Sequence, residues 1–260
     1  MPEDVDYEEV PHLQEILEFL PISPIDEEDV AGYIQNVTNL VAVNYKYGQY
    51  QFAYFGIHLL YMTYIYCTAW KISQIEPKRY RDAIVFARAY SGRDKDLKIE
   101  DAESIFAYSL MPEKDIAKLF KIIELDNSQI ANVGILVDTR NEMAHASGKF
   151  EILTDDGFET KVSSVLNSMA VIHDRMKNLI RKWYEEVLLS YCAGEYEGYD
   201  NPQDFIAEQM IQSFKLSVKE LLVCNEMSVS QLITAHRGYD KKLKDFKKAA
   251  NDYCKEWLYT

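Results

Sequence analysis

The chain has 260 residues and a formal net charge of −14, and it is 48% hydrophobic and 27% charged. This composition is typical of a globular protein and excludes a chain dominated by disordered or low-complexity sequence. Ten glycines and seven prolines are few for this length, so long helices are expected. A strongly negative charge disfavours nucleic acid as a partner, unless the charge is unevenly distributed.

The acidic residues are concentrated at the N-terminus. Residues 1–30 contain eleven Asp and Glu side chains and no Lys or Arg, so residues 31–260 hold 31 acids against 28 bases. The rest of the chain is therefore nearly neutral and can approach a polyanion. The first residues lack a basic stretch followed by an apolar run, the pattern of a targeting signal, so a cytoplasmic location is expected.

Residues 52–72 form an apolar stretch about as long as a membrane-spanning helix. Its tyrosines, its histidine and its threonines favour a buried helix with polar tips instead, so we expect no membrane association. The four cysteines are widely spaced and show neither a CxxC pair nor a neighbouring histidine at ligand spacing. They predict buried thiols rather than a metal site or a disulfide framework, and no cofactor is expected.

Apolar periodicity and helix-end signals predict an all-α fold. Residues 149–158 alone read as a strand or hairpin, and residues 192–204 read as a linker. We therefore expect an acidic N-terminal segment, a helical bundle and a C-terminal helical extension packed on the bundle, at residues 1–25, 26–195 and 200–260. The expected helices span residues 7–20, 27–74 (one helix or a pair), 77–92, 100–110, 113–125, 128–146, 159–191, 203–224, 228–236 and 239–258.

The N-terminal segment allows two interpretations. Its acids could cover a basic RNA-binding surface and leave it on activation, or the segment could have a fixed place on the bundle. An apolar helical stripe slightly favours the fixed place. The stripe consists of Val10, Leu13, Ile16, Leu17 and Leu20.

The expected helix at 128–146 carries an arginine, Arg140, on its apolar face. At 100° per residue, Arg140 falls within one arc of apolar side chains, and Asn141 and His145 share an adjoining flank. Burying a guanidinium is costly unless an anion pairs with it, so the pattern implies a carboxylate partner or a bound phosphate. A structural interpretation remains open, with Arg140 in an ion pair to another helix and His145 as a polar C-terminal residue. The apolar arc consists of Ile130, Val133, Leu136, Val137, Met143 and Ala144.

Arg140, Asn141 and, after three further residues, His145 stand near the end of this core helix, and together they resemble the motif of the HEPN (higher eukaryotes and prokaryotes nucleotide-binding) family. The resemblance implies a HEPN-like helical bundle with an additional C-terminal helical region. It also implies cleavage of single-stranded RNA without a metal ion, by attack of the ribose 2′-hydroxyl on the adjacent phosphate. His145 would be the general acid or base, Arg140 would stabilise the transition state and Asn141 would position the reacting groups.

The resemblance also implies partners. Family members usually assemble two motifs across a dimer interface, so a homodimer joined at the 128–146 helix is expected. Such an activity is typical of a toxin or an antiphage effector, with an antitoxin or another regulatory protein as a further partner. Ser147 stands where toxins controlled by a nucleotidyltransferase usually carry tyrosine, which argues against that form of control.

RNA binding also requires a basic surface, and two clusters could supply it. Near the helix that begins at Pro77, we expect Lys78, Arg79, Arg81 and Arg88 to contact RNA. The other members of this first cluster are Lys71, Arg93, Lys95 and Lys98. Acids are interleaved with both clusters, so ordinary solvated helix faces are the competing interpretation. The second cluster consists of Arg237, Lys241, Lys242, Lys244, Lys247, Lys248 and Lys255.

Two alternatives to an enzyme remain. The chain could be a non-catalytic helical interaction or nucleotide-binding module that uses Arg140 to hold its partner. It could also be a structural helical protein in which the short motif occurs by chance.

Overall fold

The computed structural model describes residues 7–22, 30–84, 104–144, 152–199, 201–236 and 238–258. Over these ranges the chain folds into helices and has no β-strand, which confirms the expected all-α fold. Contacts divide the chain into two compact units. Unit 1 comprises Met1–Leu20 and Ile25–Arg175, and unit 2 comprises Pro21–Pro24 and Met176–Thr260. Helix α7 (Asp155–Ala193) contributes residues to both.

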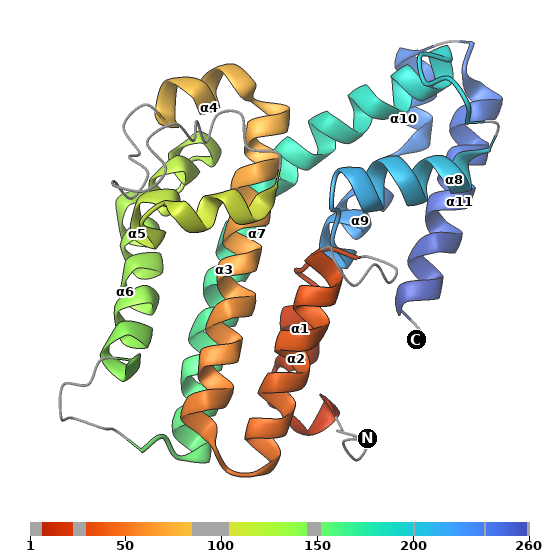
Figure 1. The fold of residues 1–260 in the computed structure, drawn as a ribbon. Coiled ribbons are helices and arrows are strands. Elements are labelled where there is room, and N and C mark those ends of the chain that lie inside the picture. The colour runs from red at the N-terminus through yellow and green to blue at the C-terminus, as the bar shows by residue number, and fades with distance from the viewer. Residues whose placement is uncertain are drawn as a thin grey trace. The chain divides into compact units, whose positions relative to one another are not determined.

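The central helix of unit 1 is α3 (Tyr50–Ile75), and it contains the apolar stretch noted in the sequence. From residue 60 to residue 69 the side chains on every side of it are buried, so this part lacks the one-sided pattern of a surface helix, whereas Phe52 and Leu59 are exposed. Helix α2 (Val30–Lys46) runs beside it, and the first part of α7 packs on another side (Figure 1). There Tyr61 Oη lies 2.8 Å from Ser168 Oγ, so this buried phenol keeps a polar partner.

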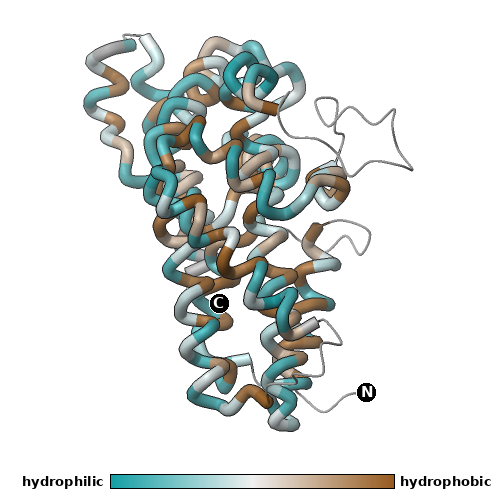
Figure 2. Tube along the Cα trace, turned by 90° about the vertical axis from the view of Figure 1, so that its left-hand side faces the viewer, coloured by the Kyte–Doolittle hydropathy of each residue, from teal (hydrophilic) through white to brown (hydrophobic). Residues whose placement is uncertain are grey.

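Along the helices, hydrophilic and hydrophobic residues alternate at short intervals (Figure 2). None of the helices within the ranges given above combines the length and the apolar character that crossing a membrane requires. The tyrosine hydroxyls, threonines and histidine of α3 interrupt its apolar surface.

Helices α2 and α3 approach each other closely at Gly56. A Cβ atom at this position would overlap Cγ2 of Val41 and would lie 2.9 Å from Cδ2 of Leu40. Since real Cβ atoms do not come this close to other heavy atoms, a larger residue at position 56 would force the two helices apart. The absence of a side chain therefore sets the separation of α2 and α3.

The remaining helices of unit 1 include α6, which carries the motif. Asp126 begins it through a reciprocal capping arrangement, because its Oδ1 accepts from the backbone N–H of Gln129 at 2.8 Å, and Gln129 Oε1 accepts from the backbone N–H of Asp126 at 2.9 Å. The elements are α4 (Pro77–Ile84), the 3-10 helix η3 (Ile105–Leu110), α5 (Glu113–Ile116), the 3-10 helix η4 (Ala117–Ile123) and α6 (Asn127–Ala144).

The described part of the N-terminal segment has a fixed place in unit 1. It forms a 3-10 turn, η1 (Tyr7–Glu9), and the short helix α1 (Leu13–Leu17) rather than one helix over 7–20. Val10, Leu13, Ile16 and Leu20 are buried, as expected for a docking face. The edge of the Phe19 ring also meets the rings of Tyr64 and His173, at centroid distances of 5.9 and 5.5 Å. Residues 1–6 and 23–29, with seven of the acids, lie outside the described residues.

Unit 2 is built around aromatic rings. The Phe205 ring lies at centroid distances of 4.8 Å from Tyr191, 4.8 Å from Tyr196 and 5.8 Å from Phe246. The indole of Trp183 stacks on Phe214 at 3.7 Å. Besides the second part of α7, the elements are α8 (Pro202–Phe205), the π-helix η5 (Ile206–Ser213), α9 (Val218–Asn225), α10 (Val229–Ala235) and α11 (Asp240–Leu258).

The four cysteines are free and buried, as the sequence indicated. Cys67 belongs to α3, and Cys192, Cys224 and Cys254 belong to unit 2. Burial raises the pKa of the Cys224 thiol well above its usual value, so the thiol stays protonated and unreactive near neutrality.

Two further expected elements are wrong. Residues 155–158 belong to α7 rather than to a hairpin, because Thr154 caps this helix: its Oγ1 accepts from Gly157 N at 3.2 Å and its carbonyl accepts from Phe158 N at 2.8 Å. The expected helix at 203–224 is broken, because Lys215 adopts a left-handed conformation (φ 61°). Ser217 and Glu220 then start α9 with a capping box.

Replacing Leu13 by alanine should destabilise the protein by about 2–5 kcal/mol, because its side chain is fully buried and its removal leaves a cavity. Urea unfolding followed by circular dichroism measures this loss. The neighbouring Gln14→Ala substitution, at an exposed position of the same helix, is the control. Equal stability of the two variants would mean that the N-terminal segment is not docked.

Candidate functional site

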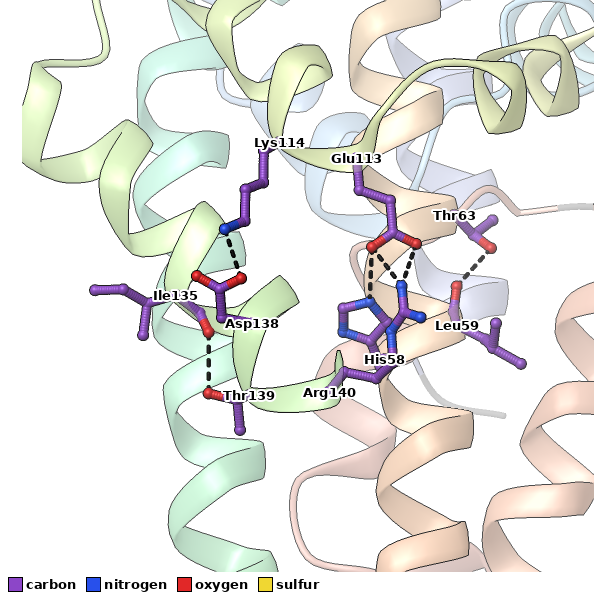
Figure 3. A network of polar contacts seen from close by, with 9 residues as sticks. All are labelled: His58, Leu59, Thr63, Glu113, Lys114, Ile135, Asp138, Thr139 and Arg140. Atoms are coloured by element: carbon purple, nitrogen blue, oxygen red, sulfur yellow. Dashed lines mark hydrogen bonds and ion pairs between the residues drawn. The ribbon is translucent and has the colours of Figure 1, made fainter. Parts of the chain in front are cut away.

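Arg140 forms an ion pair with Glu113. Its Nη2 lies 2.5 Å from both carboxylate oxygens of Glu113, and each side chain is 24% exposed (Figure 3). Arg140 lies near the end of α6, and Glu113 is the first residue of α5. The arginine on the apolar face therefore has the carboxylate partner that the sequence implied, and this partner comes from the same chain.

A histidine, His58, is the third member of the cluster. It projects from α3, is only 2% exposed and places its Nε2 3.5 Å from Oε2 of Glu113. Within the part of the chain that the structure describes, neither ring nitrogen makes a hydrogen bond that meets ordinary geometric limits, and Nε of Arg140 also lacks a partner. Glu113 is thus shared between a guanidinium and an imidazole that come from two different helices.

The surroundings of Glu113 keep it ionised. Burial acts to raise the pKa of this carboxyl, but the contact with His58 and the charge and hydrogen bonds of Arg140 outweigh burial and lower the pKa below its usual value. At neutral pH, Glu113 is therefore a carboxylate and cancels the charge of Arg140.

Tyr66 shares this environment. Burial first, and then the negative charge of Glu113, raise the pKa of Tyr66 to about 12, while Arg140 acts in the opposite direction. The phenol therefore stays protonated at physiological pH and remains a hydrogen-bond donor. Its ring stacks on that of Tyr108 at a centroid distance of 6.4 Å, which fixes its orientation.

A second ion pair joins the same two helices. Nζ of Lys114 lies 2.5 Å from Oδ1 of Asp138, with side chains that are 47% and 53% exposed (Figure 3). A pair this exposed contributes little to stability, because water screens it. The less exposed pair between Glu113 and Arg140 is therefore the stronger constraint on the position of α5 against α6.

The structure describes only part of the site that the sequence predicted. Asn141 follows Arg140 on α6 and is half-buried, whereas His145 lies outside the described residues. Arg88 also lies outside them. The other expected RNA contacts, Lys78, Arg79 and Arg81, are exposed on α4, a different helix from that of Arg140.

Sequence reasoning missed Glu113 and His58. His58 has no partner at a short, helical spacing in the sequence, because its partner Glu113 is 55 positions away in the sequence and close only in the fold. The available signal was indirect, because a guanidinium on an apolar stripe requires an acid from another helix. It could not specify which acid, since Glu113 is one of many in the chain.

A neutral groove lies between α6 and α7 within unit 1. It has a volume of about 360 Å³ and includes the apolar side chains of Ile135, which is 59% exposed, and Val171, which is 39% exposed. Its polar groups are the side chains of Gln129, Asn132, Ser164, Asn167 and Ser168. The groove contains no charged side chain, so it does not attract a phosphate. No three His, Cys, Asp or Glu side chains in the described ranges converge to hold a metal ion.

Replacing Glu113 by glutamine should cost about 1–3 kcal/mol at pH 7, because Arg140 loses its counter-charge. The lowered pKa of Glu113 means that its contribution is fully present above the ordinary pKa of 4.5 and is lost as the pH falls through the folded-state value. The difference in unfolding free energy between the wild type and Glu113→Gln should therefore shrink in acid.

Urea titrations at a series of pH values measure this difference. The control is Glu142→Gln, which removes an exposed carboxylate from α6. If the two variants gave the same pH dependence, the ion pair would not contribute to stability.

Comparison of the chain with protein-family models, with curated proteins and with solved structures found no match. A function therefore has to be argued from the chemistry of the Arg140 cluster and from the sequence motif.

Proposed function

We propose that the chain is a HEPN-type endoribonuclease that cleaves single-stranded RNA without a metal ion, with Arg140, Asn141 and His145 as its catalytic residues. The observation that supports this proposal most is the state of Arg140. Its guanidinium is held in one orientation by Glu113, is still 24% exposed and lies five residues before a histidine. A fixed arginine that solvent can reach, close in sequence to an imidazole, suits phosphate chemistry.

Arg140 has donors left for a substrate. A guanidinium carries five N–H groups, and Glu113 is contacted by Nη2. A phosphate could therefore bind beside Glu113, or could replace it and bind with the geometry that a carboxylate already uses. In either arrangement the charge that develops on the phosphorane would meet a positioned cation.

The reaction requires two proton transfers. The 2′-oxygen loses its proton and bonds to phosphorus, the bond from phosphorus to the 5′-oxygen breaks, and the departing 5′-oxygen takes up a proton. An imidazole with an ordinary pKa near 6.5 can act as base or acid near neutrality. The products are a 2′,3′-cyclic phosphate and a free 5′-hydroxyl. Two copies of the motif in a homodimer would supply one His145 for each transfer.

RNA cleavage of this kind would have to be controlled in a cell. We place the chain among toxins or antiphage effectors of the cytoplasm, held in check by an antitoxin or another regulatory protein. The exposed side chains of Lys78, Arg79 and Arg81 on α4, together with Arg88, are the proposed contacts to the RNA backbone.

A second candidate function is favoured by one observation. Glu113 already neutralises Arg140 within a single chain, as an ion pair that only joins α5 to α6 would do. On this alternative the chain is a non-catalytic helical interaction or nucleotide-binding module. The two candidates differ in whether the wild-type chain cleaves RNA.

The wild-type protein should cleave a mixed pool of unstructured RNA in the presence of EDTA, and His145→Ala should lose about 10²–10⁴-fold in rate. Arg140→Lys retains the positive charge but loses the planar guanidinium that can form two parallel hydrogen bonds, so its cleavage rate should fall about 10²–10³-fold. Glu113→Gln removes the counter-charge, but its amide oxygen can still accept from Nη2 and hold the guanidinium in place, so it should retain cleavage. Single-turnover assays on labelled RNA measure all three.

Each outcome has a distinct meaning. An equal loss in Glu113→Gln and Arg140→Lys, with both proteins folded by circular dichroism, would mean that Arg140 acts through the ion pair. Full activity of His145→Ala would remove that residue from the mechanism. A wild-type protein that leaves RNA intact would favour the second candidate.

The burial of Arg140 does not require a homodimer, because Glu113 accommodates this residue within one chain. It depends instead on exposed apolar side chains beside α6. The wild type should have twice the chain mass of 30.2 kDa in light scattering at micromolar concentration, and Ile135→Glu should be monomeric. The control is Ile152→Glu, at a position that is 74% exposed outside α6. A monomeric wild type, or equal effects of the two substitutions, would contradict an interface at α6.

A further inference from the structure

Unit 2 contains a groove lined by lysines. It lies along α11 next to the start of α10 and has a volume of about 390 Å³. Four of the seven side chains that line it are cationic, and one is anionic. The lining residues are Val229, Lys244, Lys247, Lys248, Asn251, Asp252 and Lys255.

The helical spacing of three lysines produces a stripe. Lys244 and Lys248 are one turn apart, and Lys255 follows after about two more turns, so the three project from the same face of α11. All three are exposed, and we refer to them as the lysine stripe. Over eleven residues, at 1.5 Å per residue, the stripe extends for roughly 16 Å.

Lys247 has a structural role instead. Its Nζ donates to the carbonyl oxygens of Asn225 and Met227, the second at 3.4 Å, at the C-terminal end of α9. It therefore satisfies carbonyls that a helix end leaves unpaired, and it holds α11 against α9. Burial lowers its pKa, as expected for an ammonium group withdrawn from water.

Few acidic side chains neutralise the positive charge of the lysine stripe. Lys255 lies 3.7 Å from Asp252, while Lys244 and Lys248 make no ion pair or hydrogen bond to any residue that the structure describes. The acids Asp240 and Asp245, which are interleaved with the lysines in the sequence, do not line the groove. Asp252 is the acid that lines the groove, so the groove has an excess of positive charge although Asp240 and Asp252 each lie one turn from a lysine of the stripe.

We propose that the lysine stripe binds the phosphate backbone of single-stranded RNA. Two uncompensated cations one turn apart, with a third further along, suit a ligand with several phosphates in a row rather than one small anion. The choice of RNA as the polyanion rests on the proposed function, whereas the preference for successive phosphates rests on the lysines alone. The site belongs to unit 2, so unit 2 takes part in RNA binding instead of serving only as a helical extension.

Binding can be measured without cleavage. A fluorescent, fully 2′-O-methylated RNA of about 12 nucleotides cannot react through its 2′-oxygen, so fluorescence anisotropy reports on binding whether or not the chain is a nuclease. Lys244→Gln combined with Lys248→Gln should weaken binding about tenfold at ~50 mM salt. The slope of log affinity against log salt should fall by about 1.4, since each contact to a single strand contributes about 0.7.

Three comparisons make the result specific. Lys244→Arg with Lys248→Arg keeps both charges and should retain binding. Lys118→Gln with Lys121→Gln removes the same charge from exposed positions of η4 that have no proposed contact to RNA, so a loss as large as that of the stripe variant would mean that only net charge matters and would overturn the proposal. Inorganic triphosphate should compete poorly per phosphate, and efficient competition would show a small-anion site instead of a strand site. Unchanged affinity and salt slope in the stripe variant would also overturn the proposal.

Discussion

A guanidinium on the core-facing side of a helix needs a counter-charge within reach, and this requirement organises unit 1 of the protein. Glu113 meets it for Arg140, and as the first residue of α5 it brings that short helix against α6. The same carboxylate contacts His58 of α3, so one acid links three helices. Because removing one partner would leave a partly buried charge unpaired, the three helices are constrained together more strongly than apolar packing alone requires.

Helix positions were largely predictable from the sequence, because they depend on local patterns. The burial of Val133, Leu136 and Val137 follows from their spacing on α6, and the cap at Asp126 follows from side-chain chemistry. The errors arose where the same residue type is found both at the end of a helix and in another kind of structure. Thr154 and the acids after it resemble a turn but start α7, and Lys215 ends a helix in a conformation that is usually associated with glycine. The capping box of Ser217 and Glu220 could have been recognised in the sequence, yet it lay inside a stretch that was predicted as one continuous helix.

The site was less predictable than the fold, since its members are far apart in the sequence. The position of Arg140 on an apolar arc was enough to require an anion, but only the folded chain brings Glu113 and His58 to it. Conversely, the motif singled out His145, which lies outside the described residues. The positive charge of the groove along α11 could not be predicted from the sequence either. It depends on which side chains border the groove, and Asp240 and Asp245 do not border it.

The close approach of α2 and α3 at Gly56 has a consequence for genetics. Gly56 stands two residues before His58 on α3, and any larger side chain at position 56 would press against Val41 and Leu40 and tilt or shift α3. Such a shift would move His58 relative to Glu113 although position 56 takes no part in the cluster. A random-mutagenesis screen for destabilised variants should therefore recover substitutions at Gly56 together with those at the cluster, and suppressors should arise as smaller residues at Val41 or Leu40.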